Sequence, residues 1–404
     1  MRTFLAMALG KTARFLLRLV RRGGGSSLPG TIAAAIQPKL LERAIQSAPQ
    51  GLVVVSGSAG KSSTTKIIVA LLEAHGLRVF TNPSTANIKQ GYYASVLQFG
   101  DLQGRIAADI VVLEWDEGHG AALAKELKPR LSVITNVLSD QLDRFVDPIY
   151  VQEKLAEIIN NSSTVIANRD DRNVAQIANG HADVFGFGLS AELLEAGPSY
   201  AINFGEKPEL SASALIKHAT AERLLMMLKG TDLEIAGNYE NLSQAMNVSS
   251  AVLALDALIE MDAQLVAQTI EALPPVFARD EMAMVRDRLV RLMLVQNPTS
   301  FQLNLDGLPS TPHPLMIMAG RDIHDPSWLW TVDFSRLDSV DVVSGFNAHE
   351  LALRLHYSGV EVKLVEPKID LANEHFAKLA GSDPTIVFSA DAMRRTRRYL
   401  GLAK

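Results

Sequence analysis

A glycine loop between an apolar run and a helical pattern constrains the fold more than any other feature of the sequence. The apolar run is Leu52–Ser56, which is typical of a buried strand, and a helix is predicted over Ser62–His75. Between them the chain reads Gly-Ser-Ala-Gly-Lys-Ser-Ser from residue 57 to 63. Glycines allow backbone N–H groups to turn toward phosphate oxygens, and a helix N-terminus adds partial positive charge. The pattern therefore predicts a nucleotide-binding loop formed by Gly57, Ser58, Gly60, Lys61, Ser62 and Ser63.

Two side chains of this loop carry specific chemistry. The Lys61 ammonium can neutralise β- and γ-phosphate oxygens, and the Ser62 hydroxyl can ligate Mg²⁺. The longer form of the motif would have a glycine at 55, where this chain has Val55. A helix cap without a ligand is the alternative, but the position between a strand and a helix favours nucleotide binding.

The rest of the chain alternates short apolar runs with helical patterns. This alternation is typical of a parallel sheet covered by helices on both faces, so we expect an α/β fold. We predict a helical segment and lead-in over 1–50, a central domain over 51–275 and a smaller α/β domain over 276–404, with the linker near Pro274-Pro275. Strands are predicted at 52–56, 78–81, 110–114, 131–136, 164–168, 289–296, 314–319, 339–344, 360–365 and 385–389, with short strands and turns in 200–235 and a helix over 241–260.

Composition narrows the functional classes. An apolar fraction of 48% excludes a mostly disordered chain. The formal net charge of −5 provides no general basic field, so nucleic acid is not an expected partner. The chain has no cysteine, which excludes disulfides, zinc–thiolate sites and a thiol nucleophile of its own and permits a reducing cytoplasm.

The first twenty residues are predicted to form a basic amphipathic helix. Basic residues fall on one face, with apolar residues such as Phe15 and Leu16 mostly opposite, and no apolar run is long enough to span a membrane. One interpretation is a helix packed on its own protein with a solvated charged stripe, and the other is peripheral contact of residues 11–22 with an anionic membrane.

The glycine loop resembles the Gly-Thr-x-Gly-Lys-Thr-Thr-Thr loop of Mur ligases, the ATP-dependent amide-forming enzymes of peptidoglycan synthesis. Segments Val111–Glu117, Thr135–Phe145 and Ala167–Asp171 resemble further motifs of this family. Gln141, where most Mur ligases have histidine, indicates the MurT branch, the Mur-ligase-like subunit of lipid II isoglutaminyl synthase. Similar support comes from Arg21–Gly30, Val295–Pro298, Asp325–Trp330 and Ser344–Val360. The resemblance implies a Mur-ligase central domain and a Rossmann-like C-terminal domain.

The chain departs from the MurT pattern in two places. MurT proteins commonly carry a four-cysteine zinc ribbon in the central domain, and a chain without cysteine is expected to bind no zinc. The lysine that usually precedes Asn297-Pro298 is Gln296 here, and the loop 319–325 is one residue short. These departures concern substrate handling more than the ATP site.

The resemblance implies ATP-dependent amidation of the D-glutamate α-carboxyl in the lipid II stem peptide, through an acyl phosphate. Lys61 is then expected at the phosphates, and Ser62 and Glu114 at Mg²⁺, with a salt bridge or helix cap as the alternative for Glu114. Asn168 and Asp171 are expected near the adenine or ribose, or in a plain turn.

Further polar and charged residues lie in or beside these motifs. We expect Lys154 to be a solvent-facing helix lysine, although some Mur ligases carry a carbamylated lysine there, and at least one of Asp140 and Asp143 to cap a helix. Thr85, Asn87 and Gly91 fall in a polar loop that could line the substrate side.

The chain has no cysteine, so the thiol nucleophile of a glutaminase cannot be in this chain. The resemblance implies a GatD-type glutaminase partner that contacts the C-terminal domain. It also implies that an aspartate of this chain orients the partner's Cys–His pair, as a third catalytic member does. Asp325 matches by its spacing to Ser327-Trp328, with Asp322 as the second candidate and a loop-capping role as the alternative.

Two rival functions are also compatible with the sequence. One is a stand-alone Mur or folylpolyglutamate-type ligase. The N-terminal region argues against it, because only about fifty residues precede the glycine loop, too few for a UDP-sugar-binding domain. The other is a nucleotide-binding scaffold without turnover. The presence of Glu114, a candidate Mg²⁺ ligand, argues against it. The expected localisation is cytoplasmic, at the inner face of the membrane if residues 11–22 contact lipid.

Overall fold

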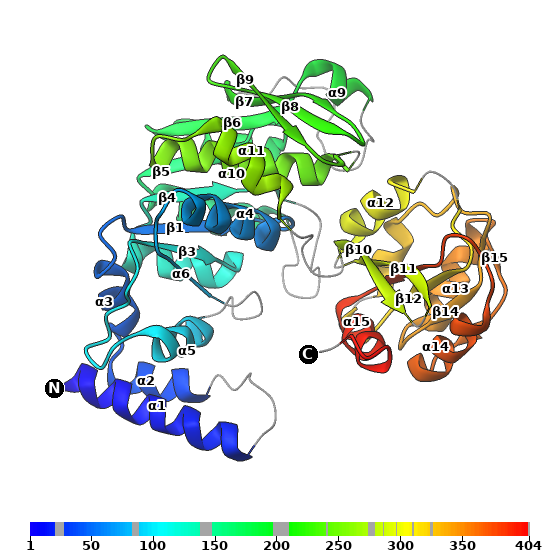
Figure 1. Ribbon diagram of the computed structural model, residues 1–404, viewed down its shortest axis with the longest axis horizontal. Helices are drawn as coiled ribbons and strands as arrows, with labels where there is room; N and C mark the ends of the chain where they lie inside the picture. The colour runs from blue at the N-terminus through cyan, green and yellow to red at the C-terminus, as the bar shows by residue number, and fades with distance from the viewer. Residues whose placement is uncertain are drawn as a thin grey trace. The chain divides into compact units, whose positions relative to one another are not determined.

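The computed structural model divides into two compact units, one made of described residues up to 273 and the other of described residues from 279 onward (Figure 1). The division falls inside the proline-containing segment 271–279. The structure describes residues 1–20, 28–82, 89–137, 148–196, 210–239, 241–273, 279–285, 287–295, 297–308, 311–323 and 326–402.

The described strands of the first unit form one sheet, in the order β2-β3-β1-β4-β5-β6-β7-β8-β9. Neighbours are parallel from β2 to β7, and β7, β8 and β9 are antiparallel. All residues of β1 (Leu52–Ser56), β3 (Ile110–Glu114) and β4 (Leu131–Ile134) are buried, as continuous apolar strands in a sheet covered on both faces should be. The other strands are β2 (Val79–Thr81), β5 (Thr164–Asn168), β6 (Val184–Leu189), β7 (Ala212–Ala219), β8 (Arg223–Leu228) and β9 (Thr231–Ala236).

Helices α4 (Lys61–Ala74), α10 (Leu242–Leu258) and α11 (Ala263–Glu271) share one hydrophobic core with this sheet (Figure 1). Val53 and Val55 of β1 belong to that core, together with Ile68 of α4 and Val252 of α10. This packing presents the N-terminus of α4 at the carboxyl end of β1, where parallel sheets bind ligands. The remaining helices of the unit are α1 (Arg2–Val20), α2 (Leu28–Ile36), α3 (Leu40–Gln46), α5 (Lys89–Phe99), α6 (Glu117–Leu127), α7 (Pro148–Asn160), α8 (Arg172–Ala178) and α9 (Ala191–Ala196).

The predicted N-terminal helix is confirmed as α1, and two of its basic side chains contact helix α5 of the same unit. Lys11 Nζ donates to the Gly100 carbonyl at 2.7 Å, and the Arg14 guanidinium donates to the amide oxygen of Gln98. Gly100 directly follows α5, where carbonyls without helical partners attract cations, and Gln98 lies in the last turn of that helix. Lys11 and Arg14 therefore help to hold the helix on its own unit.

The described strands of the second unit form a sheet in the order β10-β11-β17-β12-β14-β16, antiparallel between β10 and β11 and otherwise parallel. A short parallel pair, β13 and β15, lies apart from it. The elements are β10 (Arg279–Val285), β11 (Arg288–Leu294), α12 (Pro298–Asp306), β12 (Leu315–Met318), the 3₁₀-helix η1 (Pro326–Thr331), β13 (Ser339–Val340), β14 (Val342–Ser344), α13 (Ala348–Tyr357), β15 (Glu361–Val362), β16 (Val365–Glu366), α14 (Ile369–Lys378), β17 (Thr385–Phe388) and α15 (Ala390–Tyr399).

The predicted strand 339–344 is in fact two strands, and Asp341 is the reason. Its buried carboxylate accepts the Leu315 N–H at 2.8 Å and pairs with Lys363 at 2.9 Å. The chain passes from the small pair to the main sheet at this residue, and the predicted strand 360–365 is divided in the same way. Strands β6 and β10 were not predicted. The α/β fold with a parallel sheet in each unit is confirmed.

Candidate nucleotide-binding site

The loop between β1 and α4 contains two positions where only glycine fits. Gly57 has φ +124°, and a Cβ there would lie 2.3 Å from Thr135 Oγ1. Gly60 has φ +85°, and its Cβ would lie 2.4 Å from Asn247 Oδ1. L-residues rarely adopt such backbone conformations, and neighbouring polar atoms occupy the space that a side chain would need. The loop therefore packs closely against the rest of the protein at two points.

Residues at the end of β4 hold the loop in place. The Asn136 side chain accepts the Ala59 N–H at 2.8 Å, and its backbone carbonyl accepts the Ser58 N–H at 2.9 Å. The Thr135 hydroxyl donates to the Ala59 carbonyl at 2.6 Å. Both residues belong to the segment Thr135–Phe145, whose sequence does not indicate what each of them does; they act here by fixing the loop geometry.

Helix α4 presents its N-terminus at this loop. Its first intrahelical bond runs from the Thr64 N–H to the Gly60 carbonyl, at 2.9 Å. The N–H groups of Lys61 and Ser62 come before that bond in the chain, as the anion-binding groups of a helix terminus do. The Thr64 hydroxyl contacts Asn247 of α10 at 3.2 Å, so the turn is also anchored from a helix more than 180 residues away in the sequence.

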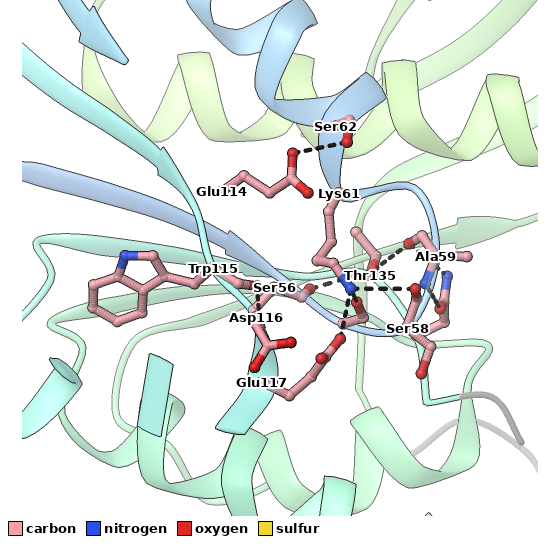
Figure 2. A network of polar contacts seen from close by, with 12 residues as sticks. Ser56, Ser58, Ala59, Lys61, Ser62, Glu114, Trp115, Asp116, Glu117 and Thr135 are labelled. Atoms are coloured by element: carbon pink, nitrogen blue, oxygen red, sulfur yellow. Dashed lines mark hydrogen bonds and ion pairs between the residues drawn. The ribbon is translucent and has the colours of Figure 1, made fainter. Parts of the chain in front are cut away.

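The Lys61 ammonium lies inside the loop and pairs with Glu117 (Figure 2). Its Nζ is 2.7 Å from Glu117 Oε1, with side-chain exposures of 12% and 4%, and it also donates to the carbonyls of Gly57 and Ser58. A lysine placed this way can exchange its carboxylate partner for phosphate oxygens. Glu117 was not assigned a function from the sequence, although it stands three residues after Glu114 in the quoted motif.

Ser62 and Glu114, which the sequence predicts to share a Mg²⁺ ion, are brought together by the fold (Figure 2). The Ser62 hydroxyl donates to Glu114 Oε2 at 2.7 Å, although 52 residues separate them. Glu114 ends β3 with its N–H donating to Asn82 Oδ1 at 3.2 Å and its carbonyl accepting from the Tyr92 hydroxyl at 2.6 Å. Burial raises the pKa of Tyr92, so this hydroxyl keeps its proton and donates.

These residues fit Mg²⁺ bound together with a triphosphate. A hydroxyl and a carboxylate oxygen are hard ligands of the kind that Mg²⁺ prefers, and this ion usually takes its other ligands from water and substrate phosphates. In the part of the chain that the structure describes, no group of three or more His, Asp and Glu side chains is arranged to hold a metal by itself. The pair Ser62–Glu114 would thus supply two protein ligands, and the nucleotide would complete the site.

Asn168 and Asp171, the candidates for the nucleoside side, make structural contacts. Asn168 donates from Nδ2 to the Thr135 carbonyl at 2.8 Å and accepts the Asp170 N–H at 3.0 Å. Asp171 caps α8 by accepting from the Asn173 and Val174 N–H groups, and its other oxygen accepts from Val137 at 2.7 Å. These contacts match the turn that the sequence analysis kept as the alternative. A role at the nucleoside stays a prediction.

Because Asp170 is buried, we expect it to make the free energy of unfolding depend on pH in an unusual direction. Burial raises its pKa from 3.8 to about 6, and its Oδ1 has no hydrogen-bond partner among the described residues. A carboxyl whose folded-state pKa is raised contributes stability that is full below pH ~4 and is lost as the pH rises through ~6. Asp170→Asn removes this titration, so its melting temperature relative to wild type should rise between pH ~4 and ~7, by an amount equivalent to at most about 3 kcal/mol. Thermal unfolding of both proteins over this range measures the difference. A difference that stays constant would contradict the prediction.

Lys154 forms an ion pair with Glu157 at 3.1 Å and lies over the Tyr150 ring. The hydrogen bond that Lys154 donates to the Glu157 carboxylate raises the pKa of Lys154, which favours the charged amine over the neutral form that carbamylation requires. Gly91, predicted in a loop, lies within α5.

Asp322 holds the N-terminus of α15. Its carboxylate accepts from the Ser389 hydroxyl at 2.6 Å and from the Ala390 and Asp391 N–H groups at 2.8 and 3.0 Å. Its oxygens are thus used within the second unit. The following predicted residues lie outside the described residues: Asp325, Gln296, Thr85, Asn87, Asp140, Gln141, Asp143, Arg21 and Arg22.

Two protein-family models match the chain. The model of the Mur ligase middle domain matches residues 55–254, which include the glycine loop, Glu114 and Asp171. The model of the MurT ligase C-terminal domain matches residues 294–388 in the second unit.

Curated relatives match over most of their length. The chain is 25% identical to "Lipid II isoglutaminyl synthase (glutamine-hydrolyzing) subunit MurT" of Streptococcus pneumoniae, over 89% of this chain and 88% of that protein. It is 26% identical to the protein of the same name from Staphylococcus aureus, over 90% of each chain.

Solved structures show the same fold. MurF ligase from Thermotoga maritima, in complex with ADP, aligns with a TM-score of 0.69 and 19% identity, over 92% of this chain and 83% of that one. FolC from E. coli, also with ADP, aligns with a TM-score of 0.63 and 15% identity, over 90% of this chain and 92% of that one.

Proposed function

Since this chain belongs to the Mur ligase superfamily, in its MurT branch, we propose that it is the ATP-dependent synthetase subunit of a lipid II isoglutaminyl synthase. The observation that carries the proposal is the arrangement of Lys61, Ser62 and Glu114 around one loop. A cationic group for phosphates and two oxygen ligands for Mg²⁺ converge there on the N-terminus of a helix.

The reaction proposed is activation of a carboxylate. An oxygen of the D-glutamate α-carboxylate attacks the γ-phosphorus of ATP, the bond from that phosphorus to the β,γ-bridging oxygen breaks, and ADP leaves. Ammonia then attacks the carbonyl carbon of the acyl phosphate, phosphate leaves with the proton that the nitrogen loses, and the amide remains. Activation is needed because a carboxylate is a poor electrophile at neutral pH.

The residues of this chain act mainly by positioning and by balancing charge. The α4 N–H groups and Lys61 would hold the phosphates, and Ser62 and Glu114 would hold Mg²⁺. Bound Mg²⁺ supplies charge neutralisation at the phosphate oxygens. Glu117 keeps the Lys61 ammonium in the loop by an ion pair until phosphate oxygens replace the carboxylate.

The decisive test is reconstitution. Purified chain, a GatD-type glutaminase, glutamine, lipid II and Mg-ATP should yield amidated lipid II and one phosphate for each amide formed, with no amide when the glutaminase and ammonia are both omitted. Phosphate release driven by an amino acid would instead identify a stand-alone ligase. Nucleotide binding without phosphate release or amide would identify a silent scaffold.

We propose that Asp325 orients the histidine of the partner's Cys–His pair. Asp325→Asn should lower glutamine-dependent amidation about a thousandfold, because an amide cannot hold the imidazole in the same tautomer. Amidation from added ammonium should stay unchanged, since it bypasses the glutaminase. Asp338→Asn, at an exposed aspartate of the same unit, is the matched control. Equal loss with glutamine and with ammonium would remove Asp325 from this role.

A further inference from the structure

Helix α1 presents an apolar face that no described part of the chain covers. Phe4, Leu5, Leu9, Phe15 and Leu16 are each between 46% and 64% exposed. Leu5, Leu9 and Leu16 are spaced by four and seven residues, and Phe4 and Phe15 by eleven, so helical periodicity places them on one side. Figure 1 shows α1 at the edge of its unit, with α2 and α5 on one side of it.

The opposite face of α1 is anchored, so the helix cannot simply turn its apolar residues inward. Ala6 and Met7 are fully buried, and a Cβ on Gly10 would lie 2.6 Å from the Leu97 side chain of α5. Lys11 and Arg14 are bonded to Gly100 and Gln98 on the same side. Close packing and the hydrogen bonds of two long side chains thus fix which residues of α1 point away from the protein.

Charge is distributed unevenly along the chain in the same region. Residues 1–41 hold seven of the 39 Lys and Arg residues and none of the 44 Asp and Glu residues. The chain as a whole carries a net charge of −5, so this segment is positive on an otherwise acidic protein. Such segregation favours an anionic partner surface.

We propose that the apolar face of α1 binds the surface of an anionic lipid bilayer. Aromatic and leucine side chains would enter the boundary between headgroups and acyl chains, and the basic segment around them, including exposed Arg2, would attract anionic headgroups. None of the described helices is long and apolar enough to cross a bilayer, so the helix lies along the surface. Residues 1–41 contain basic but no acidic residues, and this favours anionic lipid over a second copy of this chain. In a second copy the same segment would carry the same positive charge and repel the first.

Site-specific fluorescence tests the proposal directly, because the chain has no native cysteine to compete for the label. Leu9→Cys carries an environment-sensitive dye on the proposed face, and Thr231→Cys carries it at an exposed site on β9 as the control. Vesicles of equal parts phosphatidylglycerol and phosphatidylcholine should increase and blue-shift emission at position 9 only. Phosphatidylcholine alone should give a much smaller change, and added salt should weaken the response.

Vesicle co-sedimentation of the unlabelled full chain gives the second measurement. Leu5→Glu combined with Leu9→Glu should lower partitioning about tenfold or more, since it places charge on the apolar face. Leu353→Glu, at a half-exposed leucine in the second unit, should leave partitioning unchanged. Thermal unfolding and Mg-ATP binding verify that all variants fold, and neither assay depends on the proposed reaction.

Three outcomes would overturn the proposal. These are absence of wild-type binding to the anionic vesicles, binding that the double substitution leaves intact, and self-association without lipid that the double substitution abolishes. The last outcome would assign the face to a second copy of the chain.

Discussion

Lys61→Ala is expected to lower ATP-dependent phosphate release by about a thousandfold or more, equivalent to ~4 kcal/mol of transition-state stabilisation. The ammonium that faces the loop carbonyls is the one cationic side chain in the described loop, and charge on the transferring phosphoryl group needs such a partner. Phosphate release in the reconstituted system measures the rate, and calorimetry with Mg-ATP measures binding. Retained turnover would refute the assignment of the loop.

The ion pair between Lys61 and Glu117 complicates this experiment and also provides its control. Removing Lys61 alone leaves Glu117, 4% exposed, without a counter-ion, which should cost about 3 kcal/mol of unfolding free energy. The double variant Lys61→Ala, Glu117→Gln should recover most of that stability and stay inactive. Glu117→Gln alone keeps the ammonium and should keep Mg-ATP affinity within about tenfold of wild type. Recovered stability with recovered turnover would show that the effect of Lys61→Ala was structural.

Glu114→Gln is expected to lower turnover about a hundredfold and to raise the Mg²⁺ concentration needed for half-maximal rate. The amide keeps the size of the side chain and can still accept from Ser62, but it lacks the negative charge that attracts a divalent cation. A titration of rate against Mg²⁺ at saturating ATP separates the two effects.

Glu126→Gln is the matched control for this prediction. Glu126 lies on α6 and makes a surface pair with Lys89 at 3.4 Å, with more than half of its side chain exposed. Its loss should not change the Mg²⁺ dependence, because exposed pairs contribute little. An unchanged Mg²⁺ titration for Glu114→Gln would move the metal site away from β3.

The central strands and the glycine loop could be predicted because their physical requirements are local. Strands β1, β3 and β5 have the predicted bounds, since a run of Val, Ile and Leu between turns has few alternatives inside a covered sheet. The division of 339–344 at Asp341 could not be predicted, because it depends on contacts with Leu315 and Lys363 in other strands.

The residues that contact the glycine loop could not be predicted from the sequence either. Asn247 stands in a mostly apolar helix and has no signal of its own, yet it closes against Gly60. Glu117 has a signal only as an acidic residue near Glu114, and its pairing with Lys61 depends on how β1 and β3 lie side by side.

The sequence by itself determined the chemical groups available to this protein: a glycine loop before a helix, a lysine, a hydroxyl, a carboxylate at a strand end, and no thiol. Those properties follow from residue type and short spacing, which do not change when the chain folds. Only the tertiary structure decided that Glu117 holds Lys61, that Asn82 and Tyr92 hold the backbone of Glu114, and that α1 turns its apolar side outward. Each of these depends on contacts between segments far apart in the chain, and the packing of the sheet and its helices sets those contacts.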